Sequence, residues 1–297
     1  MAELLQKALL PAQSEAILLG GWDQLAGFVV RAADVAWART PAELIEAHGL
    51  GFAGSPLDES SEHIDVLRFL PSPTMQLITA TGGIDAATRA RTGGPFVDRA
   101  PFTGTGFVHT PGHVIPLWWL VPARIAPGTE LVRIDRSGSA AVRARYVDVG
   151  TGWIGDSAQA GEPRPRRISR HVGTLASLGA RHVPADLLPG SAGIALAEPD
   201  AGTPGAVRRR VVTSAEVDEL FEIEMTGTWN GLKLRIIDEW IDQNGVATVR
   251  CSSLEKNADL AEALGLVKVD AAVYEFIAPK SALENLGAMK REVPLHA

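Results

Sequence analysis

The second half of the chain repeats itself, and this repetition constrains the fold more than any other feature. Three blocks recur in the same order: residues 171–174 as 225–228, residues 193–197 as 245–249, and residues 207–217 as 273–283. Each copy consists of short apolar runs separated by turns, a pattern typical of β-strands. Because two copies are too few for a solenoid, we expect a tandem pair of small β-rich units, each an SH3-like or open barrel.

The remainder of the chain is set apart by residues 155–167, a segment rich in Pro, Gly and Arg that is typical of a linker. A chain of 297 residues is also longer than most single domains. We therefore predict an N-terminal domain at residues 1–154, the linker at 155–167, a first β-rich repeat at 168–222 and a second at 223–297.

The N-terminal domain contains one strong helix signal. Thr40 is suited to the N-cap, Pro41 to the first helical position, Glu43 to the third-position acid of a capping box, and Gly49 to a C-terminal stop. This combination predicts a helix over residues 41–48.

Weaker patterns outline the other elements. Residues 4–19 predict a short helix, a break at Pro11, and a second short helix or strand. Further patterns predict strands at residues 28–30, 64–70, 75–79, 117–121, 130–134 and 140–149, helices at 85–91 and 257–266, and a loop at 93–113. The expected fold class is α+β: a mixed α/β N-terminal domain followed by the tandem pair of β-rich units.

Composition argues against several classes of protein. The 28 Lys and Arg residues are outnumbered by 35 Asp and Glu residues, and a formal charge of −7 lacks the basic surface of a nucleic-acid-binding protein. The most apolar run, residues 114–121, is shorter than a membrane span, and the N-terminus has no secretory signal pattern. The single cysteine, Cys251, excludes an internal disulfide and a CxxC zinc site. We expect a cytoplasmic protein that binds neither nucleic acid nor membrane.

The familiar catalytic and metal-binding motifs are absent: there is no P-loop, no GxGxxG after a strand, no HExxH and no GxSxG. His109 and His113 are four residues apart, but a Pro-Gly pair between them prevents a helix, so we expect no metal site. Two tryptophans are candidates for a partner-binding surface. Trp118 lies in an apolar strand and Trp229 lies beside an Asn-Gly turn, and a place in the core is the alternative for both.

Residues 28–52 resemble the opening of the ADP-ribosyltransferase toxins of the cholera-toxin and pierisin type. The apolar run FVVR ends at Arg31, a Pro-x-x-Ile helix follows, and a Gly-Phe turn closes the segment at Phe52. Residues 77–81 (LITAT) stand where these enzymes have a Ser-Thr-Ser strand, and residues 117–121 match the next core strand.

The resemblance implies NAD as the bound cofactor, with Arg31 on its phosphates, Thr79 or Thr81 lining the nicotinamide pocket, and Glu130 as the catalytic acid. The family's last element is a Glu/Gln-x-Glu strand, yet residues 142–146 (VRARY) at its place contain two arginines and no acid. Arg31, Thr81 and Glu130 are therefore catalytic candidates only if the chain is an NAD-dependent ADP-ribosyltransferase or NAD glycohydrolase, which is the less favoured alternative.

The repeats, with the segments GTWNG, ALGL and VYEFIAPKS, are similar to modules of uncharacterised actinobacterial proteins in toxin–immunity and type VII secretion neighbourhoods. Together with the incomplete catalytic set, this resemblance favours a protein-binding protein without a cofactor. We expect an immunity protein or chaperone that neutralises or escorts a partner encoded nearby, because two related units increase avidity for one large partner. The alternatives are the NAD-consuming enzyme and a structural module of a larger assembly.

Overall fold

The fold is that of a computed structural model, which describes residues 3–52, 54–99, 102–155, 168–191, 193–200, 202 and 206–294. All but the first residue of the predicted linker at 155–167 lie outside the described residues. None of the helices in these ranges is long and apolar enough to cross a membrane.

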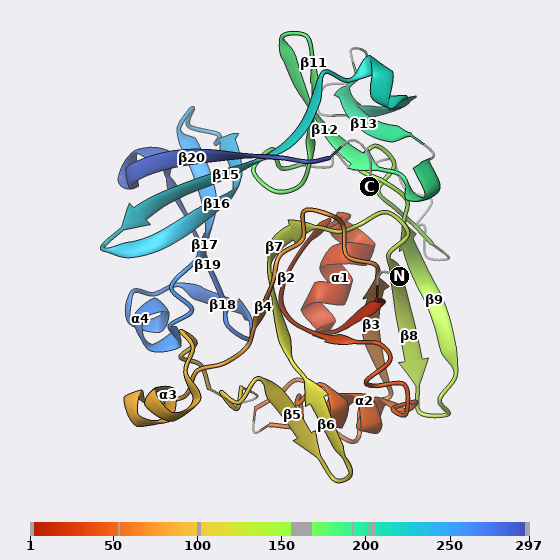
Figure 1. The fold of residues 1–297 in the computed structure, drawn as a ribbon, viewed down its shortest axis with the longest axis vertical. Coiled ribbons are helices and arrows are strands. Elements are labelled where there is room, and N and C mark those ends of the chain that lie inside the picture. Colours follow the sequence, from red (N-terminus) through yellow and green to blue (C-terminus); the bar gives the residue numbers. More distant parts are fainter. Residues whose placement is uncertain are drawn as a thin grey trace.

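The first half of the chain forms an eight-stranded sheet in which every pair of neighbours is antiparallel. The strand order is β10-β9-β8-β3-β1-β2-β7-β4, so β1 lies near the middle (Figure 1). The strands are β1 (Leu5–Leu9), β2 (Gln24–Arg31), β3 (His63–Phe69), β4 (Leu77–Thr79), β7 (Trp118–Arg124), β8 (Glu130–Asp135), β9 (Ala140–Tyr146) and β10 (Trp153–Ile154).

Short helices cover the two faces of this sheet. Helix α1 (Pro11–Gly20) buries Ile17 against one face, which we call the α1 face. Helix α2 (Pro41–Ala47) buries Leu44 and Ile45 against the other, the α2 face, together with the hairpin of β5 (Phe107–Thr110) and β6 (His113–Pro116). Because side chains alternate along a strand, strands such as β3 and β8 contribute to both cores.

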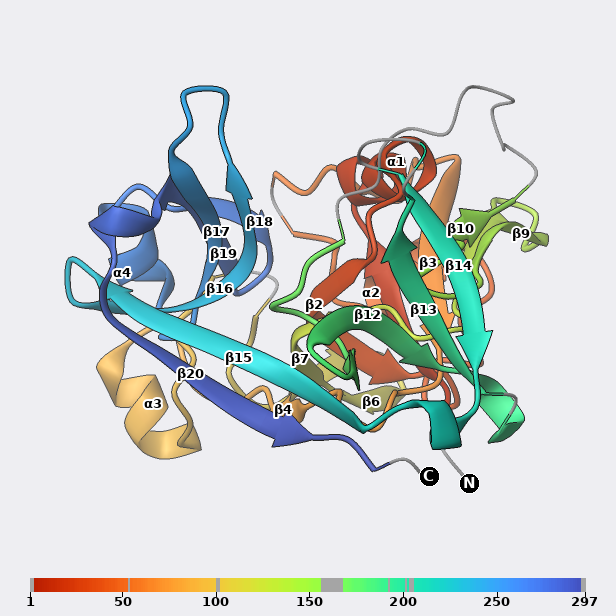
Figure 2. The same ribbon diagram turned by 90° about the horizontal axis from the view of Figure 1, so that it is seen from above.

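The second half forms a ten-stranded antiparallel sheet with the order β14-β13-β12-β11-β15-β16-β17-β19-β18, and β20 pairs with β15. Figure 1 shows β11–β13 above the first sheet and β16–β20 beside it, and in Figure 2 β15 and β20 lie side by side. The strands are β11 (Leu175–Leu178), β12 (Arg181–Leu187), β13 (Ile194–Pro199), β14 (Val207–Val212), β15 (Glu219–Trp229), β16 (Leu232–Ile241), β17 (Ala247–Ser253), β18 (Val267–Asp270), β19 (Val273–Pro279) and β20 (Glu284–Glu292).

One succession of elements occurs twice in this sheet. Strands β11 to β14 are followed by a 3₁₀ turn (Ser214–Glu216) and then by β15, which pairs back onto β11. Strands β15, β16, β17 and β19 are followed by a 3₁₀ turn (Lys280–Ala282) and then by β20, which pairs back onto β15. Strand β15 thus takes part in both successions and runs through the predicted limit at 222/223. The division into domains stays a prediction.

The expected fold class is wrong, because the N-terminal half is not a mixed α/β domain. Strands account for 48% of the structure and helices for 14%, so the protein is nearly all antiparallel β. The helix signals are correct but local: α2 has the predicted capping box at Thr40, and α3 (Ala86–Thr92) is capped by Asp85. Both helices are only seven residues long, and α3 buries none of its residues. The strands pair with one another rather than alternating with helices.

Two segments differ from their predicted structure. Residues 5–9, expected to begin a helix, form β1, because this segment pairs with β2 on one side and β3 on the other. The predicted loop at 93–113 contains β5, which ends at Thr110 and turns through a Gly112 with φ of 97° into β6. A turn of two residues is enough to make the Pro-Gly pair part of a hairpin.

The two sheets interlock through buried polar contacts. Lys7 of β1, which is 3% exposed, forms an ion pair of 2.5 Å with Asp270 at the end of β18. Arg235 donates to the carbonyl oxygen of Pro122, and Val97 forms a parallel bridge with Asn257. The buried charged groups Lys7, of the first sheet, and Arg235, of the second, therefore each have a partner in the other sheet.

Candidate functional site

The structure does not bring Arg31 and Glu130 together. Arg31 is opposite Leu5 and therefore lies on the α1 face, where it pairs with Glu3 at 2.7 Å. Glu130 is opposite Arg68 and lies on the α2 face, where it forms an ion pair with Arg145. Strands β8 and β2 are separated by β3 and β1, which at ordinary strand spacing places them roughly 14 Å apart.

Part of the predicted set does gather on neighbouring strands. The guanidinium carbon of Arg31 lies 5.7 Å from the ring centre of Trp118 in β7, and Thr79 of β4 is opposite Trp118. Thr81 lies beyond the end of β4 and forms a bridge with Thr105. Arg31, Trp118 and Thr79 are thus adjacent. Thr81 lies close to Thr79, because a Cβ placed on Gly106 would be 3.1 Å from the methyl carbon of Thr81 and 3.5 Å from that of Thr79. Glu130 lies apart from them, on the other face of the sheet.

The other residues considered in the sequence analysis, Trp229, His113 and Cys251, are packed against or buried among other side chains. Trp229 contacts Phe276 in a tilted arrangement with ring centres 4.7 Å apart, and it packs against the core formed by β16, β17 and β19. His113 stacks on Trp37 with ring centres 4.3 Å apart. Cys251 is buried, and burial raises the pKa of its thiol to about 12. Across the described ranges, no group of three or more His, Cys, Asp or Glu residues is arranged to hold a metal ion.

A groove of about 980 Å³ lies between the two sheets, and we call it the junction groove. Its volume is at the upper end of the range of small-molecule sites. None of the residues predicted from the sequence lines it. The lining comes from residues 70–74, 124–127, 173–174, 186–190, 193–194, 211–214 and Glu216.

Arg124, at the end of β7, forms part of the floor of the junction groove. Its side chain is 3% exposed, and it lies 4.0 Å from Asp23 of the first sheet and 3.7 Å from Asp186 of the second. Its guanidinium also donates to four backbone carbonyl oxygens, those of Ser169, Val172, Thr174 and Ala185. With its donors used within the protein, Arg124 holds the floor of the groove in place.

Asp186 is the one strongly perturbed acid in the groove. Burial raises the pKa of its carboxyl to about 7, although the positive charge of Arg124 and the backbone N–H of Val149, which donates to it at 2.6 Å, act in the opposite direction. Asp148 and Asp23 add further negative charge nearby, and Asp148 is itself paired with Arg209 at 2.7 Å. A carboxyl of this kind in a cleft is a recognised mark of a functional site, and also of a buried charge network.

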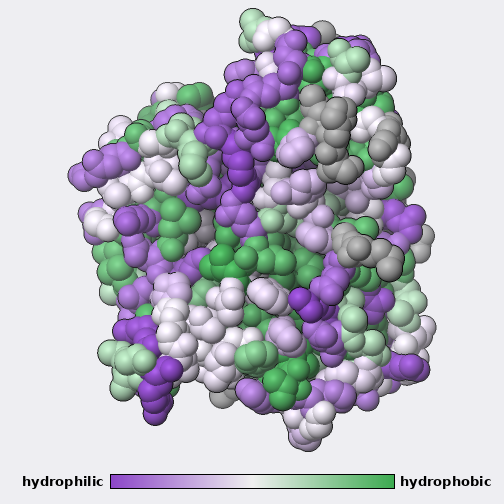
Figure 3. Space-filling view, viewed as in Figure 1, coloured by the Kyte–Doolittle hydropathy of each residue, from purple (hydrophilic) through white to green (hydrophobic). Residues whose placement is uncertain are grey.

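The walls of the groove are apolar and include a strand at the end of the sheet. β14 has β13 on one side and, in the described part of the chain, no strand on the other. Leu70 (52% exposed) comes from the first sheet's half of the chain and Val211 (42%) from β14, and both line the groove. Five residues with hydroxyl groups also line it: Ser72, Thr74, Thr174, Thr213 and Ser214. The face in Figure 3 shows hydrophobic residues at its centre below a hydrophilic band where β15 and β20 run toward β11 and β12.

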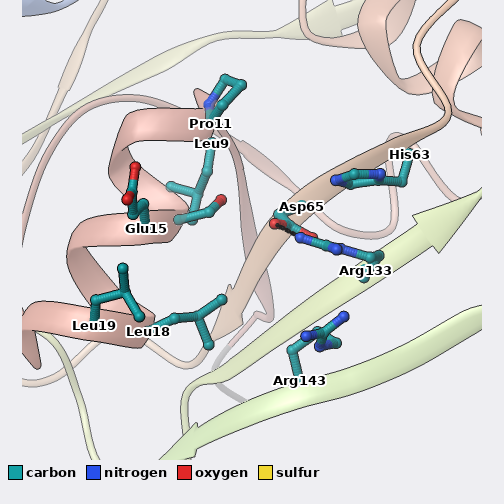
Figure 4. Close-up of a pocket in the computed structure, with 10 residues that line it drawn as sticks. Leu9, Pro11, Glu15, Leu18, Leu19, His63, Asp65, Arg133 and Arg143 are labelled. Atoms are coloured by element: carbon teal, nitrogen blue, oxygen red, sulfur yellow. Dashed lines mark hydrogen bonds and ion pairs between the residues drawn. The ribbon is translucent and has the colours of Figure 1, made fainter. Parts of the chain in front are cut away.

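A second, smaller cavity of about 310 Å³ lies between α1 and strands β3, β8 and β9 (Figure 4). We call it the helix cleft. It contains the side chains of His63, Asp65, Arg133 and Arg143 on the sheet side, and Glu15 on the helix side.

Sequence reasoning missed both cavities. In residues 142–146 (VRARY) the two arginines hold equivalent places in the alternation of the strand, so the sequence pattern does not distinguish Arg143 from Arg145. Comparison with known protein families, curated proteins and solved structures gave no match.

Proposed function

We propose that this protein binds another protein by holding an extended segment of it in the junction groove. The observation that supports the proposal is the position of the end of β14 in the wall of a groove of about 980 Å³. A strand without a second neighbour offers backbone N–H and C=O groups to an incoming peptide, which can add to the sheet as one more strand.

The side chains around the groove suit such a segment. Leu70 and Val211 present apolar surface to alternate side chains of an extended peptide, and the hydroxyl groups of Thr74 and Thr213 can satisfy its polar backbone. The buried Arg124–Asp186 floor is rigid, so little ordering is needed when the segment binds. An immunity protein or chaperone acting on a secreted partner would use this kind of recognition.

The test begins with a displayed library of random linear heptapeptides selected on the intact protein. The enriched peptides are then measured against Leu70→Asp and Val211→Asp, which place a charge on each wall. The controls are Ile241→Asp and Val267→Asp, at side chains that are 66% and 63% exposed and lie outside the groove.

We expect the groove variants to weaken binding at least about tenfold and the controls to leave it within about twofold. Methylating alternate backbone nitrogens of a selected peptide should abolish binding for only one of the two sets, because an added strand donates every second N–H to its neighbour. Failure to enrich any peptide, or equal loss in groove and control variants, would contradict the proposal.

A further inference from the structure

The helix cleft is lined by charged side chains, and within the described residues not all of them have a partner. Figure 4 shows α1 on one side and β3, β8 and β9 on the other, with Arg143 below the pair formed by Arg133 and Asp65. Its volume of about 310 Å³ is suited to a ligand of few atoms.

One of its two arginines is already neutralised. Arg133 donates two hydrogen bonds to Asp65, from Nε to Oδ1 and from Nη2 to Oδ2, each 2.8 Å long. Burial alone would raise the pKa of Asp65, but the hydrogen bonds and charge of Arg133 more than offset burial and hold that pKa below its ordinary value. This bidentate pair stays ionised and leaves Arg133 with little capacity for a ligand.

The other arginine is directed into the cleft by a β-bulge. Leu131 is opposite Ala144 and Val132 is opposite Val142, so Arg143 is the extra residue between them. Bulges re-aim side chains and are frequent beside functional sites. In the described part of the chain the Arg143 guanidinium forms no hydrogen bond or ion pair, whereas Arg145, two residues further on, pairs with Glu130 on the other face of the sheet.

The opposite wall of the cleft is mainly aliphatic. Leu9, Leu18 and Leu19 line it from β1 and α1, and Leu19 is 40% exposed. Glu15 also belongs to this wall and, in Figure 4, lies on the helix away from Arg143. In the part of the chain that the structure describes, the cleft therefore combines the unpaired guanidinium of Arg143 on its sheet side with aliphatic surface on its helix side.

We propose that the helix cleft binds a small aliphatic carboxylate. The carboxylate is held by the planar guanidinium of Arg143, which matches its geometry through two parallel N–H···O bonds. The aliphatic chain of the ligand packs against Leu18 and Leu9, and removal of this surface from water adds to the affinity. The site is separate from the junction groove and does not depend on the protein-binding proposal.

Three probes separate the contributions of charge and shape: butyrate, butyramide and inorganic phosphate. Butyramide has the shape of butyrate without its charge, and phosphate has charge without an aliphatic chain. Affinities are measured by titration calorimetry on the intact protein, and the arginine Nε resonances locate the bound anion. The variants are Arg143→Gln, Arg143→Lys and, as the matched control on the same strand, Arg145→Gln.

We expect butyrate to bind at least about tenfold more tightly than butyramide or phosphate and to shift the Nε resonance of Arg143. Arg143→Gln should weaken butyrate binding at least about tenfold, Arg143→Lys should weaken it less, and Arg145→Gln should leave it within about twofold. No butyrate binding, equal binding of butyramide, equal binding of phosphate, or equal loss in Arg143→Gln and Arg145→Gln would each overturn the proposal.

Discussion

Asp186 is a buried carboxyl whose neighbours come from both sheets. It lies on β12, faces Arg124 of β7 at 3.7 Å, and accepts a hydrogen bond from the N–H of Val149. Burial raises its pKa by more than the positive charge of Arg124 lowers it, and Arg124 also lies 4.0 Å from Asp23. The pKa of Asp186 therefore depends on how deeply the two sheets bury its carboxyl group.

This raised pKa gives a stability that depends on pH. From its ordinary value of 3.8 the pKa rises to about 7, so between these values the folded protein keeps a proton that the unfolded chain has released. The contribution of Asp186 to stability is thus largest at low pH and decreases as the pH rises toward 7, by on the order of a few kcal/mol. Urea midpoints measured across this range should show the decrease in the wild type and a flatter profile in Asp186→Asn.

Asp58 provides the control for this prediction. Hydrogen bonds from the side chain and backbone of Ser60 lower the pKa of Asp58, so its contribution to stability has the opposite sign and is lost as the pH falls. Asp58→Asn should therefore leave the decrease toward pH 7 in place. Identical profiles for the wild type and Asp186→Asn would contradict the assignment.

At the scale of elements, the segment after β4 depends on close backbone contacts at glycine. The N–H of Gly82 donates to the carbonyl of Gly104, and the N–H of Gly83 donates to that of Phe96. Gly94 has a φ of +88°, and a Cβ there would lie 2.2 Å from the carbonyl oxygen of Thr81. These contacts place Phe96 in the core beside Trp119, where the ring centres are 5.8 Å apart.

Gly94→Ala should therefore destabilise the protein by both backbone strain and overlap. Gly112, in the turn between β5 and β6, is the matched control: its φ is +97°, but nothing lies within 4 Å of the position that a Cβ would take there. We expect Gly94→Ala to lower the free energy of unfolding by at least about 1 kcal/mol more than Gly112→Ala, as measured by urea denaturation. Equal losses would mean that the Thr81 backbone moves aside without cost.

At the scale of the whole molecule, a buried ion pair joins β1 of the first sheet to the end of β18 in the second sheet. The ammonium of Lys7 bonds to Asp270 and to the carbonyl oxygen of Phe28, and Gln13 of α1 also donates to Asp270. Lys7 occupies the middle of the first sheet, where water does not reach it. The second sheet thus supplies the only carboxylate that Lys7 contacts in the described part of the chain.

Asp270→Asn should lower the free energy of unfolding by about 3–5 kcal/mol, because it leaves a buried ammonium without its counter-charge. Hydrogen exchange measured at increasing urea should show β8 and β17 losing protection together, since both sheets depend on this contact. Glu3→Gln, which removes the exposed partner of Arg31, is the control and should cost less than about 1 kcal/mol. Separate unfolding of the two strands would show that the sheets are independent.

The sequence was sufficient for elements whose signals are local. The capping residues Thr40 and Asp85 begin helices where expected, and the strand patterns at residues 64–70 and 117–121 correspond to β3 and β7. It was insufficient for β1, because a lysine in the middle of a short apolar segment looks like a surface residue. The burial of that lysine depends on Asp270, near the other end of the chain.

The candidate sites show the same division. Arg143 enters the helix cleft only because β8 and β9 pair with a bulge. The register of two paired strands cannot be predicted from the sequence of either strand alone. Arg31 and Glu130 lie on opposite faces for a related reason: a shift of one residue along a strand reverses the side on which a side chain lies.

The sequence by itself therefore determined local structure and composition. These are the capped helices, the positions of several strands, the net negative charge and the absence of familiar motifs. The tertiary structure decided which strands became neighbours, which face each side chain took, and which charges were buried together. The physical reason is that hydrogen bonds within a helix join residues close in sequence, whereas the bonds of a sheet and the partners of a buried charge come from anywhere in the chain.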